Sequence, residues 1–160
     1  MKKYFTHFES PLGTMLAIGT ETAITDLHMV SGKYVPKLGD DWIDSPTLPV
    51  FLQLRTELDE YFERKRKTFD VALAPEGTAF QRAAWVALTK IPFGQTRSYG
   101  EQAASIGSPK AVRAIGAANG KNPIAIVVPC HRVIGANGTL TGYAGGLDKK
   151  EFLLKLEGIL

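Results

Sequence analysis

The sequence predicts an α+β protein, in which a small antiparallel β-sheet with one helix is followed by a mainly helical C-terminal half. Strand-like segments occupy the first 30 residues, one amphipathic segment follows them, and two capping-box sequences open helices after residue 77. The 160 residues suffice for one compact domain or for two small domains that share an interface. We expect an N-terminal domain over residues 1–75 and a C-terminal domain over residues 76–160.

The N-terminal sheet is predicted from aromatic and β-branched runs that turn residues separate. Ser10-Pro11-Leu12-Gly13 is a turn signal, and the runs around it have the spacing of an antiparallel meander. Glycine, proline and aspartate are frequent over residues 31–49, which predicts a long loop. The expected strands cover residues 4–8, 15–18 and 24–30.

A helix is predicted over residues 50–67, because apolar side chains recur there every three or four positions. The basic run Arg64–Lys67 would lie in its last turn, where positive charge suits the helix dipole. Residues 69–77 contain proline and glycine and are typical of a linker. The residues expected on the buried face of the helix are Phe51, Leu54, Leu58, Tyr61 and Phe62.

Capping sequences predict three helices in the C-terminal half. Thr78 and Gln81 fit a capping box, and Ser98 and Glu101 fit a second one. A third helix is expected to begin at Ser108-Pro109, with serine as the N-cap and proline at the first helical position.

The second and third of these helices are joined by a tight turn, as in a helix-turn-helix motif whose second helix enters a DNA groove. Small residues give that second helix low relief, so its backbone can approach either a DNA groove or a neighbouring helix. The residues alone leave both readings open. The small residues are Ala111, Ala114, Gly116, Ala117, Ala118 and Gly120.

Charge is distributed unevenly along the chain. Residues 1–77 hold 9 lysines and arginines against 12 acidic residues, whereas residues 78–160 hold 10 against 4. A basic half suits nucleic acid or another polyanion, although a solvated basic face accounts for the charge equally well. No apolar run approaches the roughly 20 residues that span a bilayer, and no secretory signal is apparent, so we expect a cytoplasmic protein.

Cys130 is the single cysteine, so it can form neither an intramolecular disulfide nor a thiolate-rich metal site. It is either an inert buried residue or a nucleophile. His131 could serve as its base, and the positive charge of Arg132 would favour the thiolate. Residues 124–128 are typical of a buried strand that ends at Pro129, which would place the cysteine at the exit of the strand.

The residues after the cysteine predict a turn, a loop and a final helix. Residues 135–138 are a hairpin turn signal, and the glycine-rich residues 142–146 predict a loop whose Tyr143 can line a pocket. The last helix is expected over residues 149–157. Its expected buried residues are Phe152, Leu153 and Leu156.

The run Pro129–Val133, preceded by Asn122-Pro123 and followed by Gly142–Gly146, closely resembles the 6-O-methylguanine-DNA methyltransferases, also called methylated-DNA–protein-cysteine methyltransferases. The resemblance is strong over residues 78–160 and loose over residues 1–77. It implies a ribonuclease H-like N-terminal domain and a winged-helix-like C-terminal domain. It also implies a monomer that needs no cofactor or metal and acts on double-stranded DNA containing 6-O-alkylguanine, with 4-O-alkylthymine left open.

The resemblance also implies catalytic roles by position. Cys130 matches the nucleophile that accepts the alkyl group once and irreversibly. His131 matches the residue that deprotonates the thiol through a water, and Glu157 matches the carboxylate that orients this histidine. Asn122 would support the site by hydrogen bonding, and Tyr99 would donate a proton to the departing guanine.

DNA and substrate contacts are implied in the same way. Arg113 would enter the duplex and fill the space left by the flipped nucleotide, and Tyr143 would form a wall of the alkylguanine pocket. Ala144 stands where some members have a serine, which removes a hydrogen bond to the lesion oxygen and puts the substrate range in doubt. The other expected DNA contacts are Ser98, Ala111, Ala114, Gly116 and Asn119. The other expected pocket residues are Val133 and Pro129.

Two alternatives to a single-turnover DNA alkyltransferase stay open at this level. One is an acyl hydrolase that uses Cys130 with a histidine, although no oxyanion-hole signature is apparent. The other is a helix-turn-helix regulator that binds DNA without transferring a group. Binding-only relatives of the family commonly carry tryptophan in place of the nucleophile, so Cys130 argues against a purely binding relative.

Overall fold

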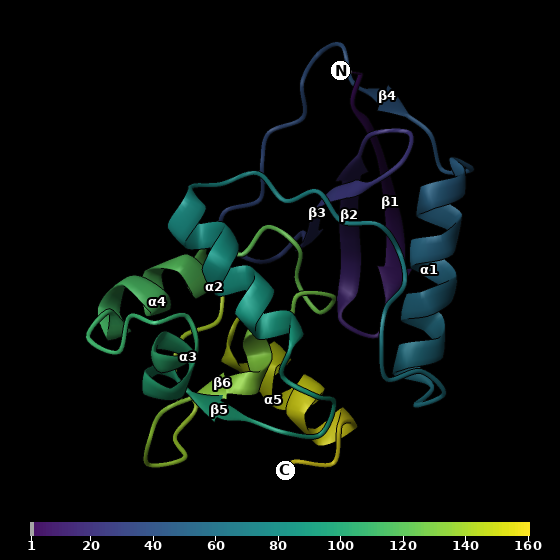
Figure 1. Cartoon of the computed structure of the whole chain (residues 1–160). Coiled ribbons are helices and arrows are strands. Elements are labelled where there is room, and N and C mark those ends of the chain that lie inside the picture. The colour runs from purple at the N-terminus through teal and green to yellow at the C-terminus, as the bar shows by residue number, and fades with distance from the viewer. Residues whose placement is uncertain (1) are drawn as a thin grey trace.

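The computed structural model of the chain describes residues 2–160 (Figure 1). A four-stranded sheet fills its N-terminal half, in the order β3-β2-β1-β4. The predicted antiparallel meander of the first three strands is confirmed. The fourth strand lies inside the expected loop and pairs in parallel with β1. The strands are β1 (Tyr4–Ser10), β2 (Gly13–Gly19), β3 (Ile24–Met29) and β4 (Ile43–Asp44).

Helix α1 (Pro49–Phe62) lies beside the sheet (Figure 1) and buries four of the five predicted apolar side chains, whereas Phe62 is only partly buried. It ends before the basic run at residues 64–67, so the predicted interaction of this run with the helix dipole is wrong. Arg64 takes a left-handed backbone conformation, with φ 61°, which stops the helix. Its side chain donates a hydrogen bond across the molecule to the Leu156 carbonyl, at 2.9 Å.

The predicted linker is fastened to the sheet. Ile24 on β3 pairs with Leu73 in a parallel bridge. The Ile24 N–H donates to the Ala72 carbonyl and the Ala74 N–H donates to the Ile24 carbonyl, both at 2.8 Å. The chain between α1 and the next helix therefore runs along β3 and continues the hydrogen bonding of the sheet.

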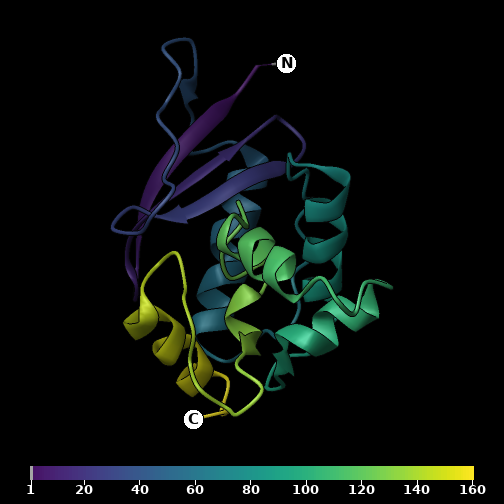
Figure 2. The same ribbon diagram turned by 90° about the vertical axis from the view of Figure 1, so that its left-hand side faces the viewer.

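Helices α2 (Ala79–Thr89), α3 (Tyr99–Ser105) and α4 (Val112–Gly120) pack together on the side of the molecule away from α1. Figure 2 shows these three helices from their own side, with α1 behind them. The capping boxes predicted at Thr78 and Ser98 are both confirmed.

The start of α4 differs from the prediction. The Ala111 N–H donates to the Ser108 carbonyl at 2.9 Å and closes a turn that contains Pro109. The helix begins only after Ala111, which has no side-chain hydrogen bond with which to cap it. Proline fixes a φ that suits a turn as well as a first helical turn, so the local sequence does not distinguish the two.

The apolar run before Cys130 is not a strand. Ile124 makes one parallel bridge with Leu27 of β3, and the chain then folds into successive turns in which Ile126 has φ 70°. The apolar side chains of the run are nevertheless largely buried. A short apolar run indicates burial, whatever the backbone conformation, so the predicted burial is confirmed and the predicted strand is wrong.

Cys130 therefore does not stand at the exit of a strand. It opens a single 3-10 turn, η1 (Cys130–Arg132), which leads into β6 (Val133–Ile134). Strand β6 pairs in parallel with β5 (Arg97–Ser98), directly before α3. Residues 135–138 form a turn as predicted, but no hairpin follows, because the partner of β6 lies earlier in the chain.

Helix α5 spans Leu147–Leu156, close to the predicted range of 149–157. Leu153 and Leu154 are buried, whereas Phe152 is 38% exposed, so the predicted burial of Phe152 is wrong. Lys150 is completely buried, which the sequence did not lead us to expect. It lies three and four residues before the two buried leucines and so shares their face of the helix.

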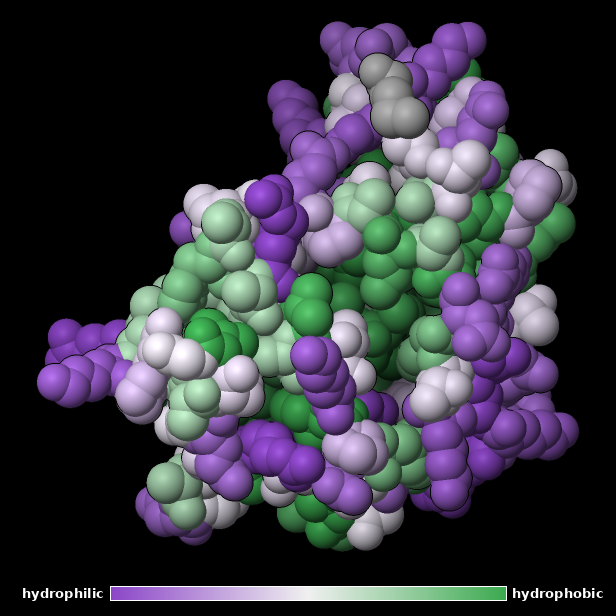
Figure 3. Space-filling view, in the orientation of Figure 1, coloured by the Kyte–Doolittle hydropathy of each residue, from purple (hydrophilic) through white to green (hydrophobic). Residues whose placement is uncertain are grey.

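One hydrophobic cluster joins both halves of the molecule. It includes side chains of the sheet and of α1 together with Trp85, Ile124 and Leu153. Figure 3 shows hydrophobic residues set back between α2 and α1, where the halves meet. The predicted α+β class is confirmed, and the boundary at residue 75 stays a prediction. Among residues 2–160, no helix combines the length and the apolar character needed to cross a bilayer.

Candidate active site

Cys130 lies at a cleft of about 480 Å³ between the helix-turn-helix and the loop before α5. Tyr99, Arg113 and Tyr143 line the same cleft. A second hollow of about 270 Å³, between β3 and the cysteine segment, also reaches Cys130. Cys130 therefore borders two hollows, one on the side of the helix-turn-helix and one on the side of β3.

Glu157 anchors the hydrogen-bond network behind the cysteine. Its carboxylate accepts hydrogen bonds from His131 Nε2 at 2.6 Å and from Arg132 Nε at 2.8 Å. It also accepts from Tyr61 Oη at 2.6 Å and from the Gly94 N–H at 3.1 Å. Burial by itself raises the pKa of this carboxyl, but the donors outweigh burial and hold the pKa at about 2. Glu157 is therefore ionised at neutral pH.

His131 is fully buried, and burial lowers its pKa although Glu157 acts in the opposite direction. The ring is therefore neutral at neutral pH. Because Glu157 is ionised and can only accept, the proton of the ring lies on Nε2. Nδ1 then carries a lone pair, and no atom of residues 2–160 donates to it. A neutral imidazole with one free acceptor nitrogen is suited to take up a proton.

The Cys130 thiol is influenced by Lys150 rather than by Arg132. Burial raises the pKa of Cys130, while a hydrogen bond from Asn122 and the positive charge of Lys150 lower it. The Arg132 guanidinium binds the Glu157 carboxylate and, at 2.7 Å, the Ile91 carbonyl. The predicted role of Arg132 in favouring the thiolate is therefore wrong, because Glu157 neutralises its charge.

Lys150 was missed at the sequence level. Its Nζ donates to the Val133 carbonyl at 2.7 Å and to the Thr141 carbonyl at 3.0 Å. Helical spacing could have found it, since Lys150, Leu153 and Leu154 fall on one face. A lysine on the apolar face of a helix needs buried acceptors, which these two carbonyls provide.

Asn122 and Tyr99 each line a hollow that Cys130 also lines. Asn122 Nδ2 donates to the Val128 carbonyl at 2.8 Å, and its Oδ1 accepts from the Ile124 N–H at 3.0 Å. The amide thus braces the turns that carry the cysteine. Tyr99 Oη lies 2.6 Å from Thr141 Oγ1 at the cleft.

The loop before α5 forms the opposite wall of the cleft. Tyr143 lines it, and its hydroxyl is buried without a hydrogen-bond partner in the described part of the chain. Ala144 lines the same wall, and its carbonyl accepts from the Lys33 N–H at 2.8 Å. Lys33 and Tyr34 thus bring the N-terminal half to the cleft, which the sequence did not predict. Tyr34 is 66% exposed and has φ 61°.

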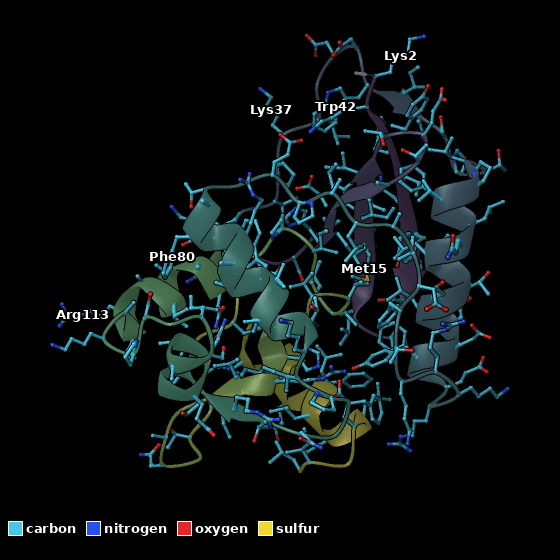
Figure 4. All side chains as sticks on the ribbon, viewed as in Figure 1. Lys2, Met15, Lys37, Trp42, Phe80 and Arg113 are labelled. Atoms are coloured by element: carbon cyan, nitrogen blue, oxygen red, sulfur yellow. The ribbon has the colours of Figure 1, made fainter. Side chains whose placement is uncertain are left out.

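Arg113 projects into solvent from the first turn of α4 (Figure 4). Beside it, Ala114 is exposed, Ala111 is partly buried, and nothing within residues 2–160 would obstruct a side chain at Gly116. This face of α4 is therefore low and open, as predicted. The Ser98 hydroxyl accepts from the Glu101 N–H in the capping box, at 3.1 Å.

Asn119 departs from its predicted place among the DNA contacts. It is buried, and its amide exchanges two hydrogen bonds with that of Gln102, at 2.7 and 2.9 Å. The pair locks α4 to α3 and uses one N–H and the oxygen of the Asn119 amide. Asn119 lies at the boundary between the exposed and the buried face of α4, and helical spacing alone does not show to which face a boundary residue belongs.

Val133 and Pro129 also depart from their predicted places in the pocket. Val133 is completely buried, and its carbonyl accepts from Lys150. Pro129 borders a separate hollow with Phe69, Phe93 and other residues on the far side of η1. Pro129 and Val133 flank the 3-10 turn on either side, and neither of them lines the cleft that Cys130 lines.

Two family models match the chain and together cover most of it. The ribonuclease-like domain of 6-O-methylguanine DNA methyltransferase matches residues 3–75, and the DNA binding domain of the same protein matches residues 79–159. The chain belongs to the 6-O-methylguanine DNA methyltransferase family. The resemblance found in the cysteine segment is therefore confirmed and extends to the N-terminal half, where the sequence alone showed only a loose likeness.

Other members of the 6-O-methylguanine DNA methyltransferase family are similar over nearly the whole chain. The methylated-DNA–protein-cysteine methyltransferase of Methanosarcina acetivorans is 54% identical over 155 residues, which are 97% of this chain and 98% of the relative. That of Haemophilus influenzae is 45% identical over 157 residues, which are 98% of this chain and 87% of the relative. The predicted enzyme class, a methylated-DNA–protein-cysteine methyltransferase, is confirmed at the level of the family.

A solved structure of the family shares the fold. The crystal structure of Mycobacterium tuberculosis OGT in complex with DNA superimposes with a TM-score of 0.90 at 45% identity. The superposition covers 96% of this chain and 92% of that one. The arrangement of an N-terminal sheet and a C-terminal helical half is therefore shared with that relative.

Proposed function

We propose that this protein repairs double-stranded DNA by transferring the alkyl group of 6-O-alkylguanine to Sγ of Cys130. One observation carries the proposal: the cysteine lines an open cleft, and the next residue is a buried His131 that an ionised Glu157 holds in place. This arrangement suits a thiol that must lose its proton before it reacts, because the thiolate is the nucleophilic form.

The transfer proceeds by substitution at the alkyl carbon. The Cys130 proton passes through a water to His131 Nδ1, which has a free lone pair. The thiolate forms the S–C bond as the bond between the alkyl carbon and the guanine oxygen breaks. Tyr99 donates its proton to the departing guanine and recovers one through solvent when His131 releases the proton that it took.

The product is a thioether, which the side chains at the cleft cannot hydrolyse. The chain has no second cysteine with which to reset the first. Each molecule therefore acts once, and repair consumes protein in proportion to the lesions removed.

The lesion must leave the base stack before it can reach Cys130. Extrusion of a nucleotide costs a few kcal/mol, less for a lesion that pairs poorly. We infer that the open face of α4 approaches the DNA groove and that Arg113, exposed at the edge of the cleft, fills the space left in the duplex. The alkylated base then lies against Tyr99 and Tyr143, which line the same cleft as Cys130. Because Ala144 replaces a serine and has no hydroxyl, backbone N–H groups donate the hydrogen bonds to the guanine oxygen.

Mass spectrometry after incubation with a duplex oligonucleotide that contains 6-O-methylguanine tests the proposal. We expect the peptide that carries Cys130 to gain one methyl group, with an end point of one methyl per protein molecule. Cys130→Ser should give no modified peptide and should still bind the duplex. Repair that continues beyond one lesion per protein molecule would indicate a hydrolase, and DNA binding with unmodified Cys130 would indicate a regulator. Either result contradicts the proposal.

A further inference from the structure

Thr141 is the hydrogen-bond partner of the proposed proton donor. Its Oγ1 lies 2.6 Å from Tyr99 Oη, at the short end of the range for two hydroxyls. Both residues line the cleft of Cys130. Thr141 belongs to the loop between β6 and α5, whereas Tyr99 is the first residue of α3, so the contact joins two walls of the site.

The backbone of Thr141 is held in place by the buried side chain of Lys150. Lys150 Nζ donates to the Thr141 carbonyl at 3.0 Å and to the Val133 carbonyl at 2.7 Å. Val133 pairs with Arg97, two residues before Tyr99. One buried ammonium group therefore holds the backbones on both sides of the contact, and the two hydroxyls meet in a preset geometry.

The hydroxyl of Thr141 has the chemistry that a proton-donating phenol requires. A threonine hydroxyl can donate one hydrogen bond and accept others. When it donates to Tyr99 Oη, the phenol proton is free to point into the cleft. When the phenol has lost that proton, the same hydrogen bond stabilises the negative charge, and hydrogen bonds to charged groups are the stronger ones. Among the side chains of residues 2–160, Thr141 alone hydrogen-bonds this hydroxyl.

We propose that Thr141 is the positioning residue for proton donation by Tyr99 during alkyl transfer. In this step the O–H bond of Tyr99 breaks and its proton goes to the guanine, which holds the electron pair of the broken bond to the alkyl carbon. The Thr141 hydroxyl turns its own hydrogen toward the phenolate and keeps it. The proposal rests on the proposed function and adds to it a residue that acts through Tyr99.

Thr141→Val tests the proposal, because valine has nearly the same shape as threonine but no hydroxyl. In single-turnover reactions with the methylated duplex, we expect transfer to Cys130 to slow by about 10- to 100-fold, the worth of a hydrogen bond to a charged group. The dissociation constant for the duplex should not change. Thr141→Ser keeps the hydroxyl and should restore most of the rate.

Iodoacetamide separates proton donation from the reactivity of the thiol. Its leaving group, iodide, needs no proton, so Thr141→Val should react at Cys130 as fast as the unaltered protein. A slower reaction would mean that the substitution disturbs the nucleophile, which contradicts the proposal. A double-mutant cycle with Tyr99→Phe adds a second check, since the cost of Thr141→Val should disappear when the phenol is absent.

The outcomes distinguish this proposal from the proposed function. If the unaltered protein acquires no methyl group, the proposed function is wrong. If it is methylated and Thr141→Val is methylated equally fast, only the role of Thr141 is wrong. A loss of rate that Thr141→Ser does not restore, or that persists in the Tyr99→Phe background, assigns Thr141 a structural role and likewise overturns the proposal.

Discussion

The positive charge of a single buried lysine, Lys150, lowers the pKa of the nucleophile. Lys150 is fully buried, and burial lowers its pKa, because a charged ammonium is unfavourable away from water. A negative charge nearby would reduce this free-energy cost. A Cys130 thiolate would be that charge, and the two groups stabilise each other's ionised forms. The adjacent Arg132, which is far more conspicuous in the sequence, is occupied by Glu157.

Replacing Lys150 by methionine should therefore make the thiol less acidic. We expect Lys150→Met to slow the reaction of Cys130 with iodoacetamide at pH 7 by about tenfold, because loss of the nearby positive charge raises the pKa of the thiol and leaves less thiolate. The midpoint of the rate against pH should move upward. Lys149→Met is the matched control, because Lys149 is partly exposed and next in sequence. Equal rates in the two variants would contradict the role of Lys150.

The helix pair of the predicted DNA-binding face depends on two buried amides. Gln102 on α3 and Asn119 on α4 exchange hydrogen bonds, and Gln102 also donates to the Ala84 carbonyl on α2 at 3.2 Å. The pair thus ties three helices together at their point of contact. The pair stabilises the protein only while both amides are present. Removing one amide leaves the other buried without a partner, which destabilises the protein more than replacing both by apolar groups.

Asn119→Ala should destabilise the protein by about 1–3 kcal/mol, because it leaves the Gln102 side chain buried without its partner. The double variant Gln102→Met with Asn119→Leu replaces both amides by apolar groups and should recover much of that loss. Urea denaturation with an unchanged slope measures both effects. A double variant less stable than Asn119→Ala would show that packing, rather than hydrogen bonding, governs this contact.

The elements that could be predicted from the sequence are those that neighbouring residues determine. The capping boxes at Thr78 and Ser98 each close within four residues, and both helices begin where predicted. The turns before Cys130 could not be predicted, because their conformation depends on Leu27 of β3, which hydrogen-bonds this segment from far along the chain. The family motif identified Cys130, His131 and Glu157. Thr141 becomes apparent only in three dimensions, because its partner Tyr99 lies far away along the chain.

At the scale of the whole molecule, the N-terminal half supports the carboxylate of the candidate site. Tyr61 on α1 donates to Glu157 Oε2 at 2.6 Å, and Arg64 donates to the carbonyl of the preceding Leu156. The Leu27 N–H on β3 donates to the Pro123 carbonyl at 2.8 Å, just ahead of the cysteine turns. The sheet and α1 therefore hold the C-terminal site in place from outside it, and this dependence should appear in the pH profile of stability.

Glu157 should make the folded protein more stable above pH 4.5 than in acid. Its pKa is about 2 in the folded state against 4.5 ordinarily, so its contribution is complete above pH 4.5 and is lost as the pH falls toward 2. A shift of this size corresponds to about 3 kcal/mol. Tyr61→Phe removes one hydrogen-bond donor and raises the pKa of Glu157 in the folded state. Glu157 then contributes less to the stability of the variant, so less stability is lost in acid.

We therefore expect Tyr61→Phe to lower the free energy of unfolding at pH 7 by about 1–3 kcal/mol, the range for a hydrogen bond to a charged group. The difference from the unaltered protein should narrow steadily between pH 4.5 and pH 2, as Glu157 becomes protonated in both proteins. Urea denaturation across this range measures it. Tyr4→Phe is the control, because the Tyr4 hydroxyl hydrogen-bonds Glu21 outside the buried network. A constant difference at every pH would mean that Tyr61 acts through packing alone and that the N-terminal half does not sustain the charge of Glu157.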